Sequence, residues 1–289
     1  MPQTINTNIA SLNAQRNLNS SQSSLATSMQ RLSSGLRVNS AKDDAAGLAI
    51  AERMNAQARG MTVAMRNAND GISLAQTAEG ALGKVADSLQ RMRELAIQAR
   101  NATNADSDKD SLDKEFGELA KEIQRVVGGT TFNGKYILGA DAATPQTFQV
   151  GPNTSANDEI TVTTPDMTRD ATIIAVAGED INGTNRGSIN RDADAGEIAA
   201  VVANIDAALD TVNSQRATLG ATQNRFDAVI SNLQVAFENQ TAARSRIMDA
   251  DFAVETSNLS RAQILQQAGN AMVAQANQLP QQVLSLLKG

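Results

Sequence analysis

The sequence from residue 54 to residue 96 reads MNAQARGMTVAMRNANDGISLAQTAEGALGKVADSLQRMRELA, and its apolar side chains recur every seven residues. The repeating line holds Met54, Met61, Ala68, Ala75, Leu82, Leu89 and Ala96, and a companion line holds Ala58, Met65 and Ile72. Two such lines are typical of a helix that buries one face against another helix. A helix of ~58 residues around this stretch would be ~87 Å long. The stretch therefore predicts an elongated helical rod.

Patterns on either side predict further helices. Ser40 and Asp43 form a variant of the capping box, which begins a helix. After the turn cluster NATNADSD (101–108), a second helix is indicated by Leu112, Phe116, Leu119, Ile123 and Val126. From residue 197 a long helical pattern resumes, with Ile198, Ile205, Val212, Leu219, Phe226 and Leu233 on its main line. Arg216 and Gln223 interrupt the companion line of that helix, which otherwise continues almost without a break into the C-terminal segment.

The middle of the chain predicts a small amount of β structure. TFQV (147–150) and EITVTT (159–164) alternate apolar and polar residues, and GPNTSAND (151–158) joins them as a hairpin loop. Residues 165–196 are rich in Asp, Asn and Gly, so we expect loops there, with one short strand at ATIIAVA (171–177). The predicted fold class is mainly α: an elongated antiparallel helical rod with a terminal coiled coil and a helical bundle that carries a β-hairpin.

Both ends of the chain combine seven-spaced apolar residues with very few charges. The N-terminal set is Leu18, Leu25, Met29, Leu32 and Leu36, and the C-terminal set is Leu265, Met272, Ala276, Leu279, Val283 and Leu286. No charged residue lies between Ala262 and Leu287, and the only charged residues before Asp43 are basic. Pro280 should kink or end the C-terminal helix.

These uncharged ends need a partner for their apolar faces. A helix on a membrane surface normally carries Lys and Arg on its polar face, and here that face is Gln, Asn and Ser. We therefore expect both sets to form a polymerisation seam with other copies, with the terminal segments disordered alone and ordered in an assembly. The alternative is a two-helix coiled coil within one chain.

The composition excludes several classes of function. The chain of 289 residues has no His, Cys or Trp, 2% aromatic residues and a net charge of -6. It lacks the usual zinc ligands, a thiolate nucleophile and a Walker-type phosphate loop, so neither an enzyme nor a cofactor is expected. It has no basic stripe interleaved with aromatics for nucleic acid, and no stretch suited to membrane insertion. The N-terminus does not resemble a secretory signal, so composition alone indicates a cytosolic protein.

Long segments of the sequence resemble those of bacterial flagellins. The N-terminal ones are INTNIASLNAQRNL (5–18), RLSSGLRVNSAKDDAAGLAIAERM (31–54) and NDGISLAQTAEGAL (69–82). The C-terminal ones are LGATQNRFDAVISNL (219–233) and ARSRIMDADFAVETSNLSRAQILQQAGNAMVAQANQLPQQVLSLL (243–287). The resemblance covers about 1–140 and 197–289 and fades within 165–196.

This resemblance implies a subunit that polymerises into the extracellular filament that bacteria rotate to swim. Export through the flagellar secretion apparatus would then replace the cytosolic interpretation. In flagellins the paired ends form a part called D0, and the longer helices with the hairpin form D1. The implied boundaries are 1–40 and 247–289 for D0, 41–196 for the D1 helices, hairpin and loops, and 197–246 for the last D1 helix, which is a minimal D0/D1 flagellin. The implied partners are other copies, the export apparatus and its chaperone, the filament cap and the hook-junction proteins.

A second function is implied by the segment QRMRELAIQ (90–98). It resembles the flagellin segment that the vertebrate Toll-like flagellin receptor, an innate immune receptor, recognises. The matching positions are Gln90, Arg91, Leu95 and, on the following helix, Glu115. Arg91 and Leu95 are i and i+4 neighbours, so they could offer an arginine fork and an apolar anchor, first to other subunits and then to the receptor once the monomer is released. The alternative is structural: Leu95 lies next to the seam line, and Arg91 is solvated.

Three rival functions remain for comparison. A hook–filament junction protein has similar ends but forms a short adaptor ring. A secreted coiled-coil adhesin would lack the paired, uncharged ends. Some flagellins carry an inserted metalloprotease domain, and the absence of histidine excludes that form.

Overall fold

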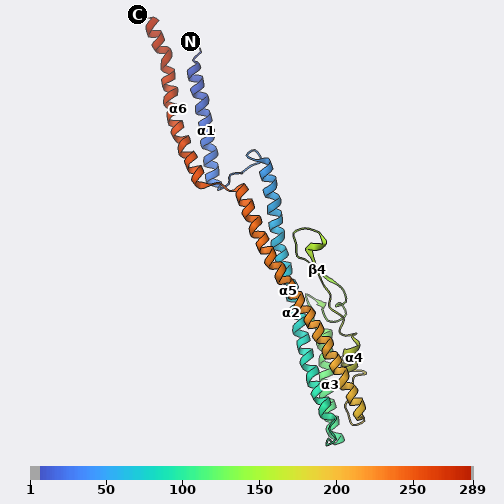
Figure 1. Cartoon of the computed structure of the whole chain (residues 1–289). Coiled ribbons are helices and arrows are strands. Elements are labelled where there is room, and N and C mark those ends of the chain that lie inside the picture. Colours follow the sequence, from blue (N-terminus) through green and yellow to red (C-terminus); the bar gives the residue numbers. More distant parts are fainter. Residues whose placement is uncertain (1–6, 288–289) are drawn as a thin grey trace. The chain divides into compact units, whose positions relative to one another are not determined.

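The computed structural model describes the backbone of residues 7–287 and the side chains of residues 7–278. The chain forms two compact units, 1–56 with 238–289 and 57–237, which are described separately. The long helices α2 (Ala45–Ala99) and α5 (Ala195–Met248) contribute to both (Figure 1). The predicted fold class is confirmed, because the described chain is mainly helical and its strands form two small two-stranded sheets.

The first unit contains the terminal pair, α1 (Ile9–Ser34) and α6 (Phe252–Leu287), which lie side by side in Figure 1. The start of α1 lies beside the end of α6, so the pair is antiparallel. Gly35 ends α1 in the left-handed conformation, with φ 71°, which glycine adopts without steric cost. Helix α6 continues past Pro280, so the proline does not end this helix as one reading of the sequence allowed.

The two chain breaks next to the terminal pair are fastened to each other. The backbone N–H groups of Arg37 and Val38 donate to the carbonyl of Met248, at 2.6 and 3.3 Å, and that of Ala250 donates to Gly35 at 2.9 Å. Val38 and Met248 are also buried in a small apolar cluster with Ala51. The α5–α6 break therefore has a structural role, whereas the sequence predicted an almost continuous helix there.

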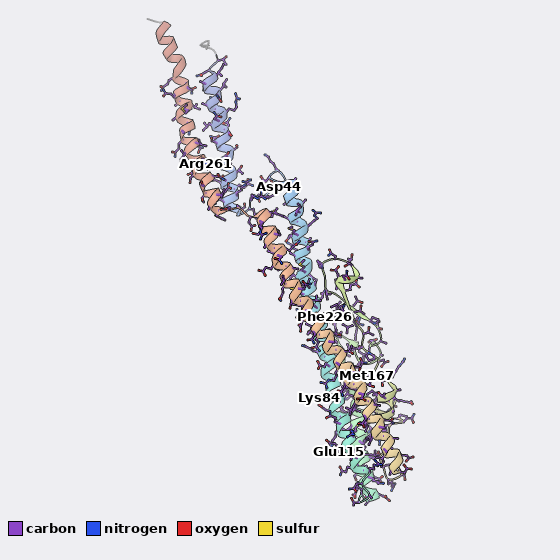
Figure 2. All side chains as sticks on the ribbon, in the orientation of Figure 1. Asp44, Lys84, Glu115, Met167, Phe226 and Arg261 are labelled. Carbon is purple, nitrogen blue, oxygen red and sulfur yellow. The ribbon has the colours of Figure 1, made fainter. Side chains whose placement is uncertain are left out.

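The start of α2 differs slightly from the predicted capping box. Ser40 and Asp43 do interact, since the backbone N–H and hydroxyl of Ser40 donate to Asp43 Oδ2 at 2.9 and 3.0 Å. The helix, however, begins at Ala45. The backbone N–H of Gly47, in the first turn, donates to Asp44 Oδ1 at 2.8 Å. Asp44 (Figure 2) caps α2, and the Ser40 contact closes the turn before it.

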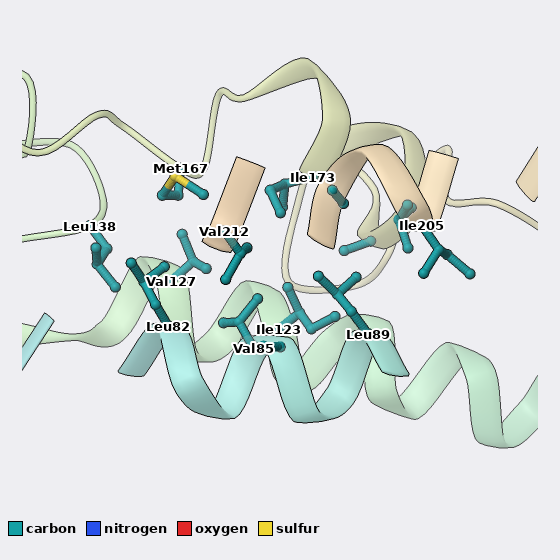
Figure 3. Close-up of a cluster of buried hydrophobic side chains, with 14 of the residues drawn as sticks. Leu82, Val85, Leu89, Ile123, Val127, Leu138, Met167, Ile173, Ile205 and Val212 are labelled. Atoms are coloured by element: carbon teal, nitrogen blue, oxygen red, sulfur yellow. The ribbon is translucent and has the colours of Figure 1, made fainter. Parts of the chain in front are cut away.

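The second unit is built on the antiparallel pairing of α2 with α5, to which α3 (Asp106–Gly129) adds a third helix. Figure 3 shows the core between them, where Leu82, Val85 and Leu89 of α2 meet residues of α3 and α5. The predicted seam lines are confirmed here: the buried members are Ala68, Ala75, Leu82, Leu89 and Ala96 of α2 and Ile198, Ile205, Val212, Leu219, Phe226 and Leu233 of α5.

The two polar residues that interrupt the α5 seam share one partner. Gln223 Nε2 donates to Glu79 Oε2 at 3.0 Å, and Arg216 Nη2 lies 3.9 Å from Glu79 Oε1. A single α2 carboxylate therefore receives both side chains. Such polar pairs inside a helix seam favour one register over others.

Two hairpins follow α3. Strands β1 (Thr131–Phe132) and β2 (Lys135–Tyr136) are joined by Asn133–Gly134, both at positive φ (49° and 80°), as two-residue hairpin turns require. Strands β3 (Gln146–Gln149) and β4 (Glu159–Val162) pair antiparallel, with the one-turn 3₁₀ helix η1 (Ala156–Asp158) before β4. This second hairpin is the one that the sequence predicted.

The segment 165–196 contains a helix, α4 (Ala171–Ala177), so the predicted strand at 171–177 is wrong. The β-branched residues of this run suggested a strand, but Asp170 accepts the N–H of Thr172 at 2.9 Å and caps a helical turn. Ile173 and Val176, three residues apart, are buried on one face of α4. Packing of that face on the core therefore outweighs the intrinsic β preference.

The rest of this segment is held to α3 by a largely buried ion pair. Arg186 Nη2 lies 2.6 Å from Asp113 Oδ2, and the N–H of Ile189 donates to Asp113 Oδ1 at 2.9 Å. Burial raises the pKa of the Asp113 carboxyl, but these hydrogen bonds outweigh it and hold the pKa below its usual value. The Arg186 guanidinium also lies over the Phe116 ring, at 5.7 Å. The segment is therefore part of the second unit's core.

Substitution of one glycine of α2 would test the packing of α2 against α5. A Cβ atom added at Gly71 would lie 2.5 Å from Cζ of Phe226 on α5 (Figure 2), whereas nothing lies within 4 Å of one added at Gly80. We expect Gly71→Ala to lower the free energy of unfolding by ~1–3 kcal/mol through overpacking. Gly80→Ala, the matched control, should raise it by up to ~1 kcal/mol through helix propensity. Urea unfolding followed by circular dichroism measures both, and equal stability of the two variants would contradict the packing.

Candidate functional site

The inner seam of the terminal pair is made largely of small and polar side chains. On α1 the buried and half-buried positions recur three and four residues apart, at Ser11, Ala14, Leu18, Ser21, Leu25, Ser28 and Leu32. The equivalent positions on α6 are Glu255, Leu259, Ala262, Gln266, Gly269, Val273 and Ala276. Small residues at every second or third place let the two backbones approach closely.

Direct contacts confirm this close approach. The Asn8 side-chain amide donates to the carbonyl of Ala276 at 2.7 Å, and the Ser11 hydroxyl to Asn277 Oδ1 at 2.7 Å. A Cβ atom added at Gly269 would lie only 3.1 Å from Cδ1 of Leu18. Both helices are formed and paired in the single chain, so the structure differs from the expectation of terminal segments that order only on assembly. The two-helix coiled coil that the sequence left open is present.

The predicted seam residues divide into two groups. Leu18, Leu25, Leu32 and Leu36 are half-buried, and Ala276 is buried. Met29, Leu265 and Met272 are instead 57%, 50% and 63% exposed, so they do not pack in the inner seam of this pair, and their predicted role in a seam with other copies stays a prediction. The side chains of Leu279, Val283 and Leu286 lie outside the described residues.

Several large apolar side chains of the terminal pair remain exposed outside its inner seam. On α1 these are Ile9, Leu12 and Met29, and on α6 they are Phe252, Val254, Ile264, Leu265 and Met272. Apolar area removed from water contributes roughly 25 cal/mol per Å², and clusters of exposed apolar residues mark interaction surfaces. On α6 the seven-spaced residues Leu265 and Met272 therefore belong to an outward face, whereas on α1 the seven-spaced Leu18, Leu25 and Leu32 lie in the inner seam.

Sequence reasoning missed Ser11, Ser28 and Gly269 because a search for apolar periodicity does not register serine or glycine. Their signal is a line of small residues that runs parallel to the leucines at the same spacing.

A second candidate surface lies on α2 and α3. Arg91 Nε donates to Glu115 Oε1 at 2.9 Å, and Arg91 Nη1 donates to Glu94 Oε2 at 2.9 Å. The hydrogen bonds that Arg91 donates to Glu94 and Glu115 raise the pKa of Arg91. Gln90, Arg91 and Glu115 (Figure 2) are all exposed, and the structure brings the last two together.

Leu95 does not belong to that exposed surface. It is 1% exposed and packs in the core of the second unit, so the expectation of an apolar anchor beside Arg91 is wrong. Arg91 and Leu95 are four residues apart on α2, as the sequence indicated. The Arg91 side chain, however, is exposed to solvent, whereas the Leu95 side chain lies in the core. Only the polar members of the predicted set are available to a partner.

No group of three or more acidic side chains among the described residues could hold a metal ion. No helix in that part of the chain is long and apolar enough to cross a membrane.

Comparison with known proteins shows which family has this architecture. The family model for the bacterial flagellin N-terminal helical region matches residues 5–143, and that for the C-terminal helical region matches residues 202–287. A flagellin of Halalkalibacterium halodurans is 46% identical over 284 residues, which cover 98% of this chain and 99% of that protein. This chain belongs to the bacterial flagellin family. Family membership supports a structural, self-associating role in the flagellar filament.

Further flagellins are similar to this chain. One from Bacillus subtilis is 45% identical over 306 residues, covering 98% of this chain and 99% of the relative. A crystal structure of Bacillus cereus flagellin is 32% identical, covers 58% of this chain and 88% of its own, and has a TM-score of 0.47. The two family models leave 144–201 unmatched, the region where the sequence resemblance was also expected to fade.

The terminal seam can be tested by filling its closest approach. Gly269→Leu places a side chain where even a Cβ atom would lie 3.1 Å from Leu18, so we expect the pair to lose ~1–3 kcal/mol of stability. Met272→Leu is the matched control, because Met272 is exposed on the same helix. Hydrogen exchange of the α1 amides in the monomer measures the effect. Equal protection of α1 in both variants would contradict the seam described here.

Proposed function

We propose that this flagellin is a structural subunit that polymerises into the filament with which bacteria swim. The observation that carries the proposal is the outward apolar face of the terminal pair, which the described residues of its own chain leave uncovered. Leu265 and Met272 are exposed on a different face of α6 from the residues that pack against α1. A second copy of the chain would bury them, and repeated heterologous contacts of this kind generate open helical polymers.

The scarcity of charge on the terminal pair supports the same proposal. In α1 and α6 the only charged residues are Arg16, Arg31, Glu255 and Arg261. Burying a surface with so few charges carries little desolvation cost. Neighbouring copies can therefore pack closely around each pair.

The location and other partners follow from the filament role. The subunit would be secreted by the flagellar export apparatus with the help of its chaperone and would act outside the cell. It would be added beneath the filament cap on a base of hook-junction proteins. The alternative, a hook–filament junction protein, would use the same ends but stop after a short ring, so extended growth of filaments separates the two.

The outward face can be tested by making it polar. We expect Leu265→Gln combined with Met272→Gln to leave the helix content of the monomer unchanged, because both residues are exposed. The lowest concentration that elongates filament seeds should rise at least ~10-fold, since burying one such side chain stabilises by ~1.5–3 kcal/mol. Electron microscopy of seeded growth measures this.

The matched control exchanges the same two residues, Leu265→Met with Met272→Leu, and should elongate seeds as the unmodified chain does. Elongation by the glutamine variant at the unmodified concentration would contradict the proposal. Loss of monomer helix in that variant would also contradict it, by showing that these side chains serve their own chain.

We also propose that the released monomer is recognised by the vertebrate Toll-like flagellin receptor. Support comes from the exposed pair of Arg91 and Glu115, which places an arginine fork and a carboxylate on one surface across two helices. Gln90 lies beside Arg91 and is exposed too. The contribution of Leu95 is to hold α2 in the core beneath this surface.

The receptor proposal predicts a loss of signalling potency when the pair is removed. Arg91→Ala with Glu115→Ala should raise the half-maximal concentration in a receptor reporter cell assay at least ~10-fold, as expected for an interface residue worth more than ~1.4 kcal/mol. Lys84→Ala is the matched control, because Lys84 is an exposed cation of the same helix. Equal potency of the double variant and the control would contradict receptor recognition at this surface.

A further inference from the structure

The sequence contains two Asn–Gly pairs, Asn133–Gly134 and Asn182–Gly183, and both lie in the second unit. Glycine has no Cβ atom, so its backbone nitrogen can approach the side chain of the preceding asparagine with little steric hindrance. That approach is the first step of deamidation, in which asparagine loses its side-chain amide through a cyclic imide. The local surroundings of the two pairs therefore decide which of them can react.

The first pair forms an exposed turn. Asn133 and Gly134 are both exposed, and they join β1 to β2. The paired residues on either side of this turn are Phe132 and Lys135. In a β-turn the hydrogen bond runs from the first carbonyl to the fourth N–H, so the N–H of Gly134, the third residue, takes no part in it. The backbone hydrogen bonds of the described residues include none from that N–H.

The second pair lies in a turn that is closed by hydrogen bonds. The Gly183 N–H donates to the carbonyl of Asp180 at 2.9 Å, so the nitrogen that would attack is engaged. The Asp180 carboxylate accepts the backbone N–H of Asn182 at 3.0 Å, its side-chain amide at 3.4 Å and the N–H of Thr184 at 2.9 Å. These contacts hold both the asparagine side chain and the glycine nitrogen in place.

The two turns also differ in how easily they open. The hairpin of β1 and β2 has only two residue pairs, and a two-stranded hairpin is marginally stable by itself. The turn at Asn182 is fastened to the end of α4, because the Glu179 N–H donates to the Thr184 carbonyl at 2.9 Å. An asparagine must leave its resting conformation to reach the glycine nitrogen, and local opening of this kind is easier in the hairpin.

We propose that Asn133 is a site of spontaneous deamidation in the folded protein, whereas its turn protects Asn182. A base in the solvent takes the proton of the Gly134 N–H, and the nitrogen attacks Cγ of Asn133. The new N–C bond closes the imide, the bond from Cγ to the side-chain nitrogen breaks, and that nitrogen leaves with the added proton as ammonia. Water then opens the imide at either carbonyl, which gives aspartate or isoaspartate.

The two products have different consequences for the hairpin. Asn133 has a φ of 49°, in the left-handed region that aspartate also tolerates, so the aspartate product can keep the turn. Isoaspartate lengthens the main chain of the loop, and loop length sets the register of a hairpin. Asn133 also lines a cavity of about 420 Å³ together with Asp70 and Asp141, so either product adds a carboxylate to that cavity.

The first test compares the two asparagines within one chain. Full-length folded monomer is incubated at mildly alkaline pH and digested, and chromatography with mass spectrometry measures asparagine, aspartate and isoaspartate at each position. We expect Asn133 to convert at least ~5-fold faster than Asn182, as for the loss of one hydrogen bond at Gly183. In guanidinium chloride the two rates should become similar, because both asparagines precede glycine.

The second test releases the protected turn. Asp180→Ala removes the carboxylate that holds Asn182 and Thr184, so conversion of Asn182 in the folded chain should rise ~3-fold or more. Conversion of Asn133 should stay unchanged. Asp166→Ala is the matched control, because Asp166 accepts the Thr168 N–H in a similar turn that holds neither pair, and it should leave both rates unchanged.

The inference does not depend on the filament function, since both tests use the monomer. Equal conversion of the two asparagines in the folded chain, or faster conversion of Asn182, would overturn it. Absence of conversion at Asn133 over the time in which the unfolded chain reacts would overturn it too. An unchanged rate at Asn182 in the Asp180→Ala variant would show that this turn does not give the protection.

Discussion

Helices α1 and α6 approach closely because serine, alanine and glycine occupy many of their seam positions. Gly269 lies against Leu18, and the side chains of Asn8 and Ser11 reach acceptors on α6 directly. Larger side chains at these places would push the two backbones apart. The α6 side of the seam is therefore made mainly of small and polar residues, and larger apolar residues of α6 such as Leu265 and Met272 remain on the outside.

Because some residues pack the terminal pair and others stay exposed on its outside, the stability of the monomer and its assembly depend on different faces of the same two helices. A terminal pair that buried all of its leucines and methionines internally would have no apolar surface for a neighbour. A pair without any internal seam would have to order completely at each addition to a filament, at a conformational entropy cost of ~1–2 kcal/mol per residue. The observed pair is already formed, so contacts between α1 and α6 of one chain offset the conformational entropy of ordering these helices. Its outward face remains available for other copies.

The long helical elements could be predicted from the sequence because strong seven-residue periodicity survives in α2 and α5. The face of α6 that packs against α1 could not be predicted, because the same seven-residue spacing occurs on two neighbouring faces of that helix. Gly269 marks the face that packs, and glycine gives no apolar signal. The strand predicted at 171–177 failed for another reason: β-branched residues suggested a strand, but the local cap from Asp170 and the burial of Ile173 in the core of the second unit favour a helix. For Leu95 the sequence left two interpretations open, because the residue lies next to the seam line, and its burial in the core favours the structural one.

The most direct test of this account is an image reconstruction of the filament at side-chain resolution. The account predicts that Ser28 and Ala262 contact their own chain, while Leu265 and Met272 are buried against a neighbouring copy. Burial of Leu265 and Met272 against α1 of the same chain, or their exposure to solvent in the assembled filament, would contradict the assignment of an inner seam and an outward assembly face.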